Sequence, residues 1–214
     1  MRSFVGPLLF VTALSLALVP GPEARAQGSN GNTQSRITGA IDNTRLVVLS
    51  HSVHPLARPE FDQGPAPVDL PFDRMLLVLK RNEQQESALK QLLDQQQDKS
   101  SPNYHKWLTP DEFGRRFGPS DHDVQAVTLW LEAQGFQVAG ATHGRTGIEF
   151  SGTAGQVQNA FHAAIHKFVV NGEEHWANAN DPEIPAALGQ VVEEAHHGMA
   201  VTLVEREAVA AVVE

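Results

Sequence analysis

The chain has 214 residues, no cysteine and a formal net charge of −9. Without cysteine no disulfide can form, so the packing of side chains must stabilise the fold. The negative charge argues against a nucleic-acid-binding protein, because such proteins need a basic face to meet phosphates.

The first 26 residues have the pattern of a secretory signal peptide. Arg2 supplies a positive charge, residues 4–19 are almost wholly apolar, and the chain then reads Ala-Arg-Ala just before Gln27. We predict a signal peptide at 1–26, with cleavage between Ala26 and Gln27. The product would be secreted, periplasmic or extracellular, and outside the membrane. An uncleaved anchor is the alternative, although the apolar run is short for a membrane span.

Residues 27–71 predict a flexible lead-in with one short strand. Residues 27–43 are rich in Gly, Ser, Asn and Gln, so they can bury little. The sequence TRLVVLS at 44–50 has an apolar, partly β-branched centre, which is typical of a strand. Several prolines between 51 and 68 favour an extended connection.

The predicted domain covers residues 72–198 and starts with a strong strand signal. Residues 72–80 contain the continuous apolar run MLLVL, which indicates a central strand. Residues 82–98 place three leucines on one face of an otherwise polar helix. Further strands are predicted at 136–139, 146–151, 164–170 and 173–177, with a hairpin turn at Asn171-Gly172, a turn at Asp181-Pro182-Glu183-Ile184-Pro185 and a helical or extended segment at 186–194.

Three capping signals mark helix starts. Thr109 and Thr153 each precede a Glu or Gln by three residues, the pattern of a capping box. Pro110 fits the first helical position, and Gly118 or the glycine four residues before it ends that helix. Ser120 is the predicted N-cap of the next helix. The element order is β-α-β-β-α-β with insertions, which predicts an α+β sandwich with helices on one face of an antiparallel sheet.

No catalytic or metal site is visible. The histidines at 162 and 166 have helical spacing, but the chain leaves the helix between them, and surface histidine is favoured over a metal site. The segment Ser151-Gly152-Thr153 lacks the G-x-S-x-G pattern, and Thr153 is needed as a cap, so a strand-to-helix turn is favoured over a nucleophile. We therefore expect no catalytic residue, no metal and no cofactor. Binding, inhibition or chaperoning remain.

One long stretch carries a family resemblance. The pattern S-P-x-Y-H-x-W-L-T-P-x-E-F-x-x-x-F-G-P-S runs from residue 101 to residue 120 and resembles the activation (pro-) domain of sedolisin-type serine-carboxyl peptidases, the kumamolisin family. Its residues are Tyr104, His105, Trp107, Thr109, Pro110, Phe113, Phe117, Gly118 and Ser120. The match continues downstream through Ser151, Gly152, Thr153, Phe161, Asn171, Gly172, Asp181, Pro182 and Pro185.

The resemblance implies a ferredoxin-like sandwich like that of subtilisin propeptides. It also implies an intramolecular chaperone and inhibitor that covers the active site of a protease domain, in cis or in trans, and leaves by acid-triggered autoprocessing. The family's catalytic triad and calcium site belong to a catalytic domain that would follow Gly198. We expect 199–214 to be a tail, either the start of a linker or a truncation scar, and the chain not to be an enzyme by itself.

Two alternatives stay open: a standalone extracellular interaction module or trans-acting inhibitor, and a serine-type peptidase as the family label alone suggests. We expect the motif's aromatic residues to anchor the connecting helix to the sandwich, and Arg115 and Arg116 to lie in solvent or at an interface. Acid release would involve interface carboxylates that become neutral and histidines that become cationic. The histidines considered are His105, His175, His196 and His197.

Overall fold

The computed structural model of the chain describes residues 34–193 and 201–203. The predicted signal peptide at 1–26, its cleavage point between Ala26 and Gln27, and the pair His196-His197 lie outside the described residues. In the described part, no helix is long and apolar enough to cross a membrane.

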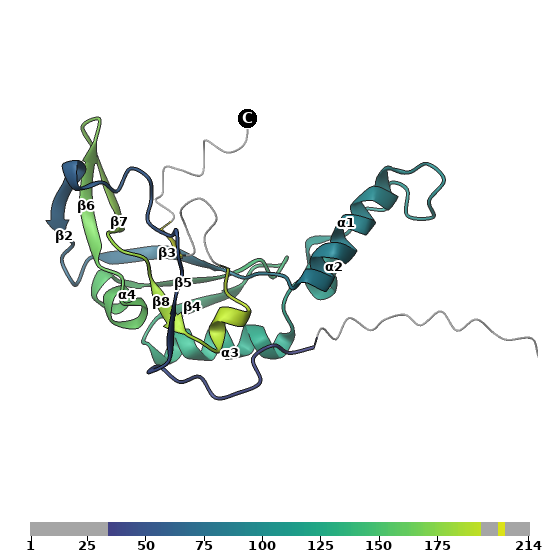
Figure 1. Cartoon of the computed structure of the whole chain (residues 1–214), viewed down its shortest axis with the longest axis horizontal. Helices are drawn as coiled ribbons and strands as arrows, with labels where there is room; N and C mark the ends of the chain where they lie inside the picture. The colour runs from purple at the N-terminus through teal and green to yellow at the C-terminus, as the bar shows by residue number, and fades with distance from the viewer. Residues whose placement is uncertain (1–33, 194–200, 204–214) are drawn as a thin grey trace, which may run out of the picture. The chain divides into compact units, whose positions relative to one another are not determined.

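The centre of the fold is a four-stranded antiparallel sheet. Its spatial order is β4-β5-β3-β9, made by β4 (Gln137–Ala141), β5 (Gly147–Thr153), β3 (Pro71–Val78) and β9 (Val201–Leu203). Two helices, α3 (Asp121–Ala133) and α4 (Ala154–Phe161), lie on the same side of it (Figure 1). Read in chain order, these elements run β3-α3-β4-β5-α4-β9, the β-α-β-β-α-β order of a ferredoxin-like fold. The predicted fold class is confirmed.

The fourth strand comes from the segment that we expected to be a tail. Val201–Leu203 pair with Leu77, Leu76 and Met75 along one edge of β3. The same edge also holds the chain just before residue 194, where Lys80 N–H donates to the Val191 carbonyl and Glu193 N–H donates to the Val78 carbonyl. A continuous apolar strand such as β3 is stabilised by partners on both edges. The sheet therefore extends beyond the limit expected at residue 198.

A second sheet is built from insertions. Its order is β2-β6-β7, with β2 (Asp62–Pro65), β6 (Ile165–Val170) and β7 (Glu173–Asn178), and the short helix η1 (Pro59–Phe61) leads into it. The turn between β6 and β7 uses Asn171 at φ 53° and Gly172 at φ 87°, as a two-residue hairpin requires. The strands predicted at 164–170 and 173–177 are confirmed, but they lie outside the central sheet.

Between β3 and α3 the chain forms a helical insertion, residues 82–117, called the arm below. It contains α1 (Glu83–Gln97) and α2 (Pro110–Phe117), and Figure 1 draws it beyond the end of the β4–β5 hairpin. Its buried apolar side chains, Leu92 and Phe117, do not belong to the main core cluster. The side-chain amide of Gln85 donates to the Gly118 carbonyl at 2.7 Å and ties the start of α1 to the end of α2.

Residues 35–53, called the strap below, correct the expectation of a flexible lead-in. Ile37 and Leu49 are 3% and 1% exposed and belong to the main core. Strand β1 (Leu46–Val48), within the segment predicted as a strand, pairs with β8 (Glu183–Pro185), which the short helix η2 (Leu188–Gln190) follows. The polar composition of this segment concealed isolated apolar residues that reach the core.

The main core lies between the central sheet and its two helices. Four aromatic rings interlock in it. The ring centroids of Trp130 and Phe161 are 5.3 Å apart and those of Phe136 and Phe150 are 5.0 Å apart, both pairs in an edge-to-face arrangement. The centroids of Phe136 and Phe161 are 5.8 Å apart. Edge-to-face contacts of this kind add to the stabilisation from apolar burial.

Candidate docking face

The face of the central sheet opposite α3 and α4 carries neither of these two helices (Figure 1). On β3, Met75 and Leu77 point into the core and are fully buried. The alternate residues Leu76 and Val78 are half-buried and take no part in the core cluster. Since side chains of a strand alternate between faces, these two lie on the opposite face. We call it the open face.

The open face continues across β5 with mixed chemistry. Arg74 Nε contacts Glu149 Oε1 at 2.9 Å and joins β3 to β5 through an exposed ion pair. Beside it, Gly147 lies under Leu76, because a Cβ on this glycine would come within 2.7 Å of Leu76 Cδ1. The surface therefore combines apolar side chains with a charged pair, and protein interfaces likewise combine an apolar centre with polar groups.

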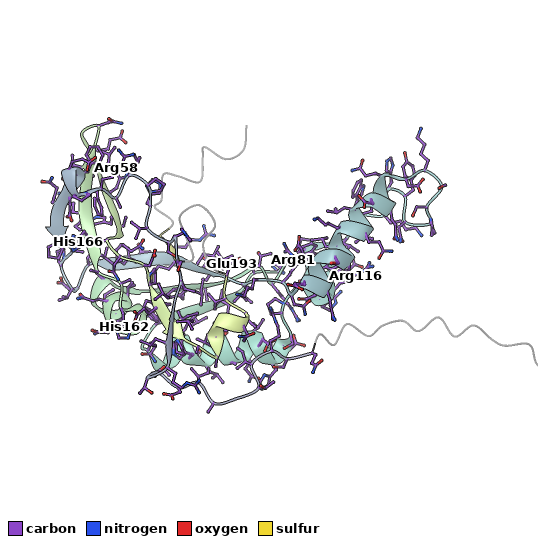
Figure 2. All side chains as sticks on the ribbon, in the orientation of Figure 1. Arg58, Arg81, Arg116, His162, His166 and Glu193 are labelled. Carbon is purple, nitrogen blue, oxygen red and sulfur yellow. The ribbon has the colours of Figure 1, made fainter. Side chains whose placement is uncertain are left out.

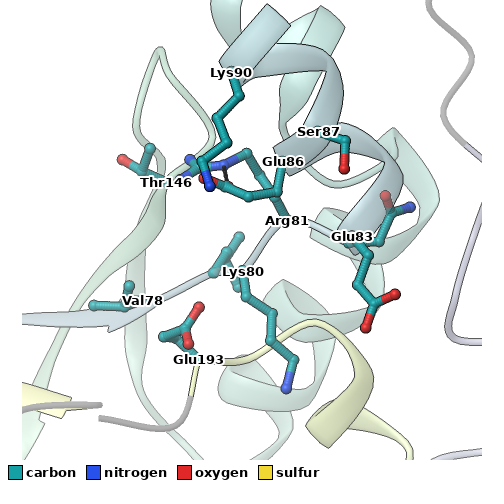
Figure 3. Close-up of a pocket in the computed structure, with 11 residues that line it drawn as sticks. Val78, Lys80, Arg81, Glu83, Glu86, Ser87, Lys90, Thr146 and Glu193 are labelled. Atoms are coloured by element: carbon teal, nitrogen blue, oxygen red, sulfur yellow. Dashed lines mark hydrogen bonds and ion pairs between the residues drawn. The ribbon is translucent and has the colours of Figure 1, made fainter. Parts of the chain in front are cut away.

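A groove of about 630 Å³ lies at the end of β3, next to the start of α1 (Figure 3). Its lining mixes cations and anions. Arg81 Nε contacts Glu86 Oε2 at 2.7 Å, so that pair is internally neutralised. Glu193, at the end of the first described range, also lines the groove. Its lining residues are Val78, Leu79, Lys80, Arg81, Asn82, Glu83, Glu86, Ser87, Lys90, Thr146 and Glu193.

The sequence motif at 101–120 is divided between the surface of the arm and its interior. The rings of Tyr104 and His105 stack with their centroids 3.8 Å apart, and the His105 and Trp107 centroids are 5.9 Å apart. The Trp107 side chain is 66% exposed. Trp107 therefore does not anchor the arm to the sandwich, and that expectation is wrong. Phe117 is 1% exposed and lies 5.5 Å from the ring of Phe113, so these two rings do pack inside the arm.

Arginines cover this small aromatic cluster. The guanidinium carbon of Arg116 lies 5.0 Å from the Phe117 ring centroid, and that of Arg81 lies 5.9 Å from the Phe113 centroid. Figure 2 shows Arg81 and Arg116 together at the base of the arm. Arg115 and Arg116 are exposed, as expected. Cation–π contacts of this kind place positive charge on an apolar cluster without burying it.

The three predicted helix caps are confirmed. Thr109 Oγ1 accepts from the Glu112 N–H at 3.3 Å, and Glu112 Oε2 accepts from the Thr109 N–H at 2.8 Å. The backbone N–H and the hydroxyl of Thr109 together lower the pKa of Glu112. Ser120 Oγ accepts from the Asp123 N–H, and Thr153 forms the second capping box, with Pro110 at the first position of α2 and Gly118 as its C-cap.

Asp123 is a binding point that sequence reasoning missed. Its carboxylate is fully buried and accepts from the backbone N–H groups of Arg36 and Ile37 and from the Ser35 hydroxyl, at 2.7 to 3.1 Å. Burial acts to raise the pKa of Asp123, but these hydrogen bonds outweigh burial and hold the pKa below its ordinary value. An acidic residue in the first turn of a helix is common because it complements the helix dipole, so the local sequence gives no sign of its contact with a segment 86 residues away.

Asp181 makes a similar contact at the other end of the strap. Its carboxylate accepts from the backbone N–H groups of His51, Ser52 and Val53, at 2.8 to 3.3 Å. Pro182 and Pro185 are buried, and the Pro182 carbonyl accepts from Leu49 N–H at 2.8 Å. The motif D-P-x-I-P is thus the segment that receives the strap.

The histidines at 162 and 166 belong to different elements (Figure 2). His162 ends α4 in a left-handed conformation at φ 50°. His166 lies on β6 and contacts Asp62 on β2 at 2.8 Å. The pKa of Asp62 is lowered mainly by a hydrogen bond from the Gly64 backbone N–H and, to a smaller extent, by the hydrogen bond with His166. Within the described ranges no group of three or more metal-ligating side chains is found.

The segment Ser151-Gly152-Thr153 is a strand end turning into α4. Ser151 pairs with Gln137 in the sheet. A Cβ on Gly152 would lie 2.6 Å from the Phe136 ring, so the glycine is required by packing. Together with the cap at Thr153, this supports the strand-to-helix reading of the motif.

The chain matches a protein-family model and is similar to two curated peptidases. Residues 62–196 match the family model described as Pro-kumamolisin, activation domain. The chain is 39% identical over 89 residues to Xanthomonalisin of Xanthomonas sp. (strain T-22), covering 42% of this chain and 11% of that protein. It is 29% identical over 116 residues to Sedolisin of Pseudomonas sp. (strain 101), covering 54% of this chain and 20% of that protein. The chain thus spans at most a fifth of these relatives.

Proposed function

The chain belongs to the family of Pro-kumamolisin activation domains, and from this premise we propose that it serves a sedolisin-type serine-carboxyl peptidase as intramolecular chaperone and inhibitor. By this proposal it is not a peptidase itself. It is exported, pairs with the protease domain in cis or in trans, and needs no cofactor of its own.

One observation carries the proposal: the open face of the central sheet. Leu76 and Val78 are only half-buried and lie outside the core cluster, while the opposite face is closed by α3 and α4. Burying such a face against a partner gains apolar free energy and leaves the domain's own core intact. This is the property that a domain needs to template the folding of an enzyme surface and then remain on it.

The path of the C-terminal segment supports inhibition. After Pro185 the chain runs through η2 and pairs with the end of β3 at Val191 and Glu193. It returns at Val201–Leu203 as the edge strand β9, whose last residue pairs with Met75 of β3, so it leaves the central sheet along the edge of the open face. A protease docked on the open face would receive this segment near its cleft, where it would act as a competitive plug.

Acid release follows from the interface and not from unfolding of the domain. Histidine–carboxylate contacts within the described fold, such as His166 with Asp62 and His143 with Asp111, are strengthened by a positive charge on the histidine. Asp62 and Asp123 have pKa values below the ordinary value, so they remain ionised in mild acid. Glu149 lies on the open face and Glu193 lines the groove, so both carboxylates are placed to contact an enzyme docked there.

The direct test is inhibition of a purified sedolisin-type peptidase by the full chain. We expect tight inhibition near neutral pH, weakening by about tenfold or more toward pH 4 as interface carboxylates and histidines gain protons. Circular dichroism over the same range should show the domain still folded. Equal inhibition at every pH would contradict the acid release, and no inhibition at any pH would contradict the inhibitor role.

A second candidate, a standalone interaction module, is favoured by the surface of the arm. The Tyr104–His105–Trp107 stack ends in a tryptophan that is 66% exposed, and exposed tryptophans are enriched where proteins bind partners. If Trp107→Ala abolishes partner capture while peptidase inhibition is unchanged, this second function exists beside the first.

A further inference from the structure

The strap is attached to the domain mainly through its own backbone. Two carboxylates, Asp123 and Asp181, accept from five backbone N–H groups of the strap, as described above. At the same time β1 pairs with β8, and Ile37 and Leu49 fill the core. The strap therefore closes the core from outside the region of family resemblance, which begins at residue 62.

The strap braces the segment that leads to the C-terminal part of the chain. Ala186 N–H donates to the Arg45 carbonyl at 2.7 Å. Arg36 Nη1 donates to the Gln190 carbonyl at 2.8 Å, and Arg36 Nη2 donates to the Lys80 carbonyl at 2.7 Å. One strap residue thus joins η2 to the end of β3. Without the strap, residues 182–191 would lose their outer partner.

A single exposed loop, residues 54–58, connects the strap to the rest of the domain. His54, Pro55, Leu56 and Arg58 are exposed, with Leu56 at 43%. The loop's hydrogen bonds are local: Ala57 N–H donates to the His54 carbonyl and Arg58 Nε donates to the Pro55 carbonyl. Exposed loops with local bonds open at low free-energy cost and are the preferred sites of proteolytic nicking.

We infer that loop 54–58 is a proteolytic site that controls the strap. Hydrolysis of one peptide bond there adds water across the bond and leaves a new carboxylate and a new amine. The strap then loses the effective concentration that its covalent tether supplies, and it dissociates on dilution. Residues 182–191 lose their brace, and with it the support for the segment that pairs with the end of β3 at Val191 and Glu193. This inference rests on the proposed function for its consequence, loss of inhibition, but not for the release of the strap.

The test inserts the recognition sequence of a highly specific protease between Pro55 and Leu56 of the full chain. A matched control carries the same insertion in the exposed hairpin turn between Asn171 and Gly172. Both proteins are cut at neutral pH and diluted, and their hydrogen exchange is followed at the Ala186 amide, with the Leu79 amide of β3 as internal reference. We expect strap release and exchange at Ala186 faster by about tenfold or more only after the cut in loop 54–58.

A second variant avoids any insertion. Ile37→Ala weakens the strap at its core contact in the uncut chain, and it should speed exchange at Ala186 more than at Leu79. A peptide of residues 34–53 added in excess to the nicked and depleted protein should restore the protection of Ala186.

The outcomes separate the two proposals. If the cut protein keeps its strap on dilution, or loses it with no change at Ala186, the strap inference is overturned. If the uncut chain does not inhibit a sedolisin-type peptidase, the proposed function is overturned, while the exchange experiment still decides the role of the strap. If inhibition is lost after the cut in loop 54–58 but kept after the control cut, the result supports both the strap inference and the proposed inhibitor function.

Discussion

The central sandwich and the arm contain similar densities of aromatic residues and use them in opposite ways. In the sandwich, Phe150 and Phe161 are 1% and 0% exposed and belong to one interlocked cluster. In the arm, Trp107 is 66% exposed and Tyr104 only half-buried. Caps, amide hydrogen bonds and a small Phe113–Phe117 pair hold the arm instead. The sandwich is thus stabilised by a large interlocked core, and the arm by caps, a small aromatic pair and contacts with the turn between β4 and β5, such as His143 with Asp111.

The sharpest test of this difference is Phe161→Ala. The ring contacts three other aromatic side chains, so its removal leaves a large cavity and should cost about 4 kcal/mol of unfolding free energy. Urea denaturation followed by tryptophan fluorescence measures the loss. A cost below about 1 kcal/mol would show that the sandwich can collapse around the gap and that the cluster is not the source of its stability.

Asp123→Ala tests the contact between the strap and the sandwich. It leaves buried strap N–H groups without an acceptor and should cost about 3 kcal/mol at neutral pH. Because the pKa of Asp123 is lowered from 3.8, its contribution is fully present above that pH and is lost as the pH falls through the lowered pKa. The gap between wild type and variant should therefore narrow below pH 4.

The matched control for this prediction is Asp94→Asn on the exposed side of α1. It should leave stability nearly unchanged at every pH. If the Asp123 variant and the control differ equally little from wild type, the strap is not held as described.

The arm and the sandwich each contain a helix that begins with a threonine capping box, so the same substitution can be made in both regions. Thr109→Ala and Thr153→Ala each remove a capping box and should each cost about 1 kcal/mol locally. We expect hydrogen exchange to accelerate at the Phe113 amide alone in the first variant, and across α4 and the sheet in the second. Exchange that accelerates throughout the sheet in Thr109→Ala would show that arm and sandwich unfold as one unit.

The smallest expected effect is that of Trp107→Ala. An exposed side chain contributes little to folding, so the unfolding free energy should change by no more than about 0.5 kcal/mol. Thermal denaturation measures it. A larger loss would restore Trp107 to the anchoring role that the sequence pattern predicted for it.

The same contrast explains what the sequence could and could not predict. Capping boxes at Thr109 and Thr153 and the hairpin at Asn171-Gly172 depend on neighbouring residues, and they were predicted correctly. Exposure of Trp107 and the buried contacts of Asp123 depend on segments far away in the chain. No local pattern distinguishes an aspartate that merely starts a helix from one that also receives a strap.

The open face was only partly predictable for a similar reason. The run MLLVL at 75–79 shows that β3 is central and apolar, but a continuous apolar strand gives no sign of which face is covered. The open face can be recognised only in the structure, where Met75 and Leu77 belong to the core and Leu76 does not. The fourth strand was missed because a three-residue strand lies below what periodicity can detect.

The most direct test of docking through the open face is to place a charge either on that face or on the solvent side of α3. Leu76→Glu puts a carboxylate on the open face, and Leu129→Glu puts one on the solvent side of α3, where Leu129 is 56% exposed. Inhibition of a sedolisin-type peptidase near neutral pH is measured for both folded variants. The account predicts that Leu76→Glu weakens inhibition by about tenfold or more, because it buries an unpaired charge at the interface, and that Leu129→Glu leaves it unchanged. Equal inhibition by the two variants would contradict docking through the open face.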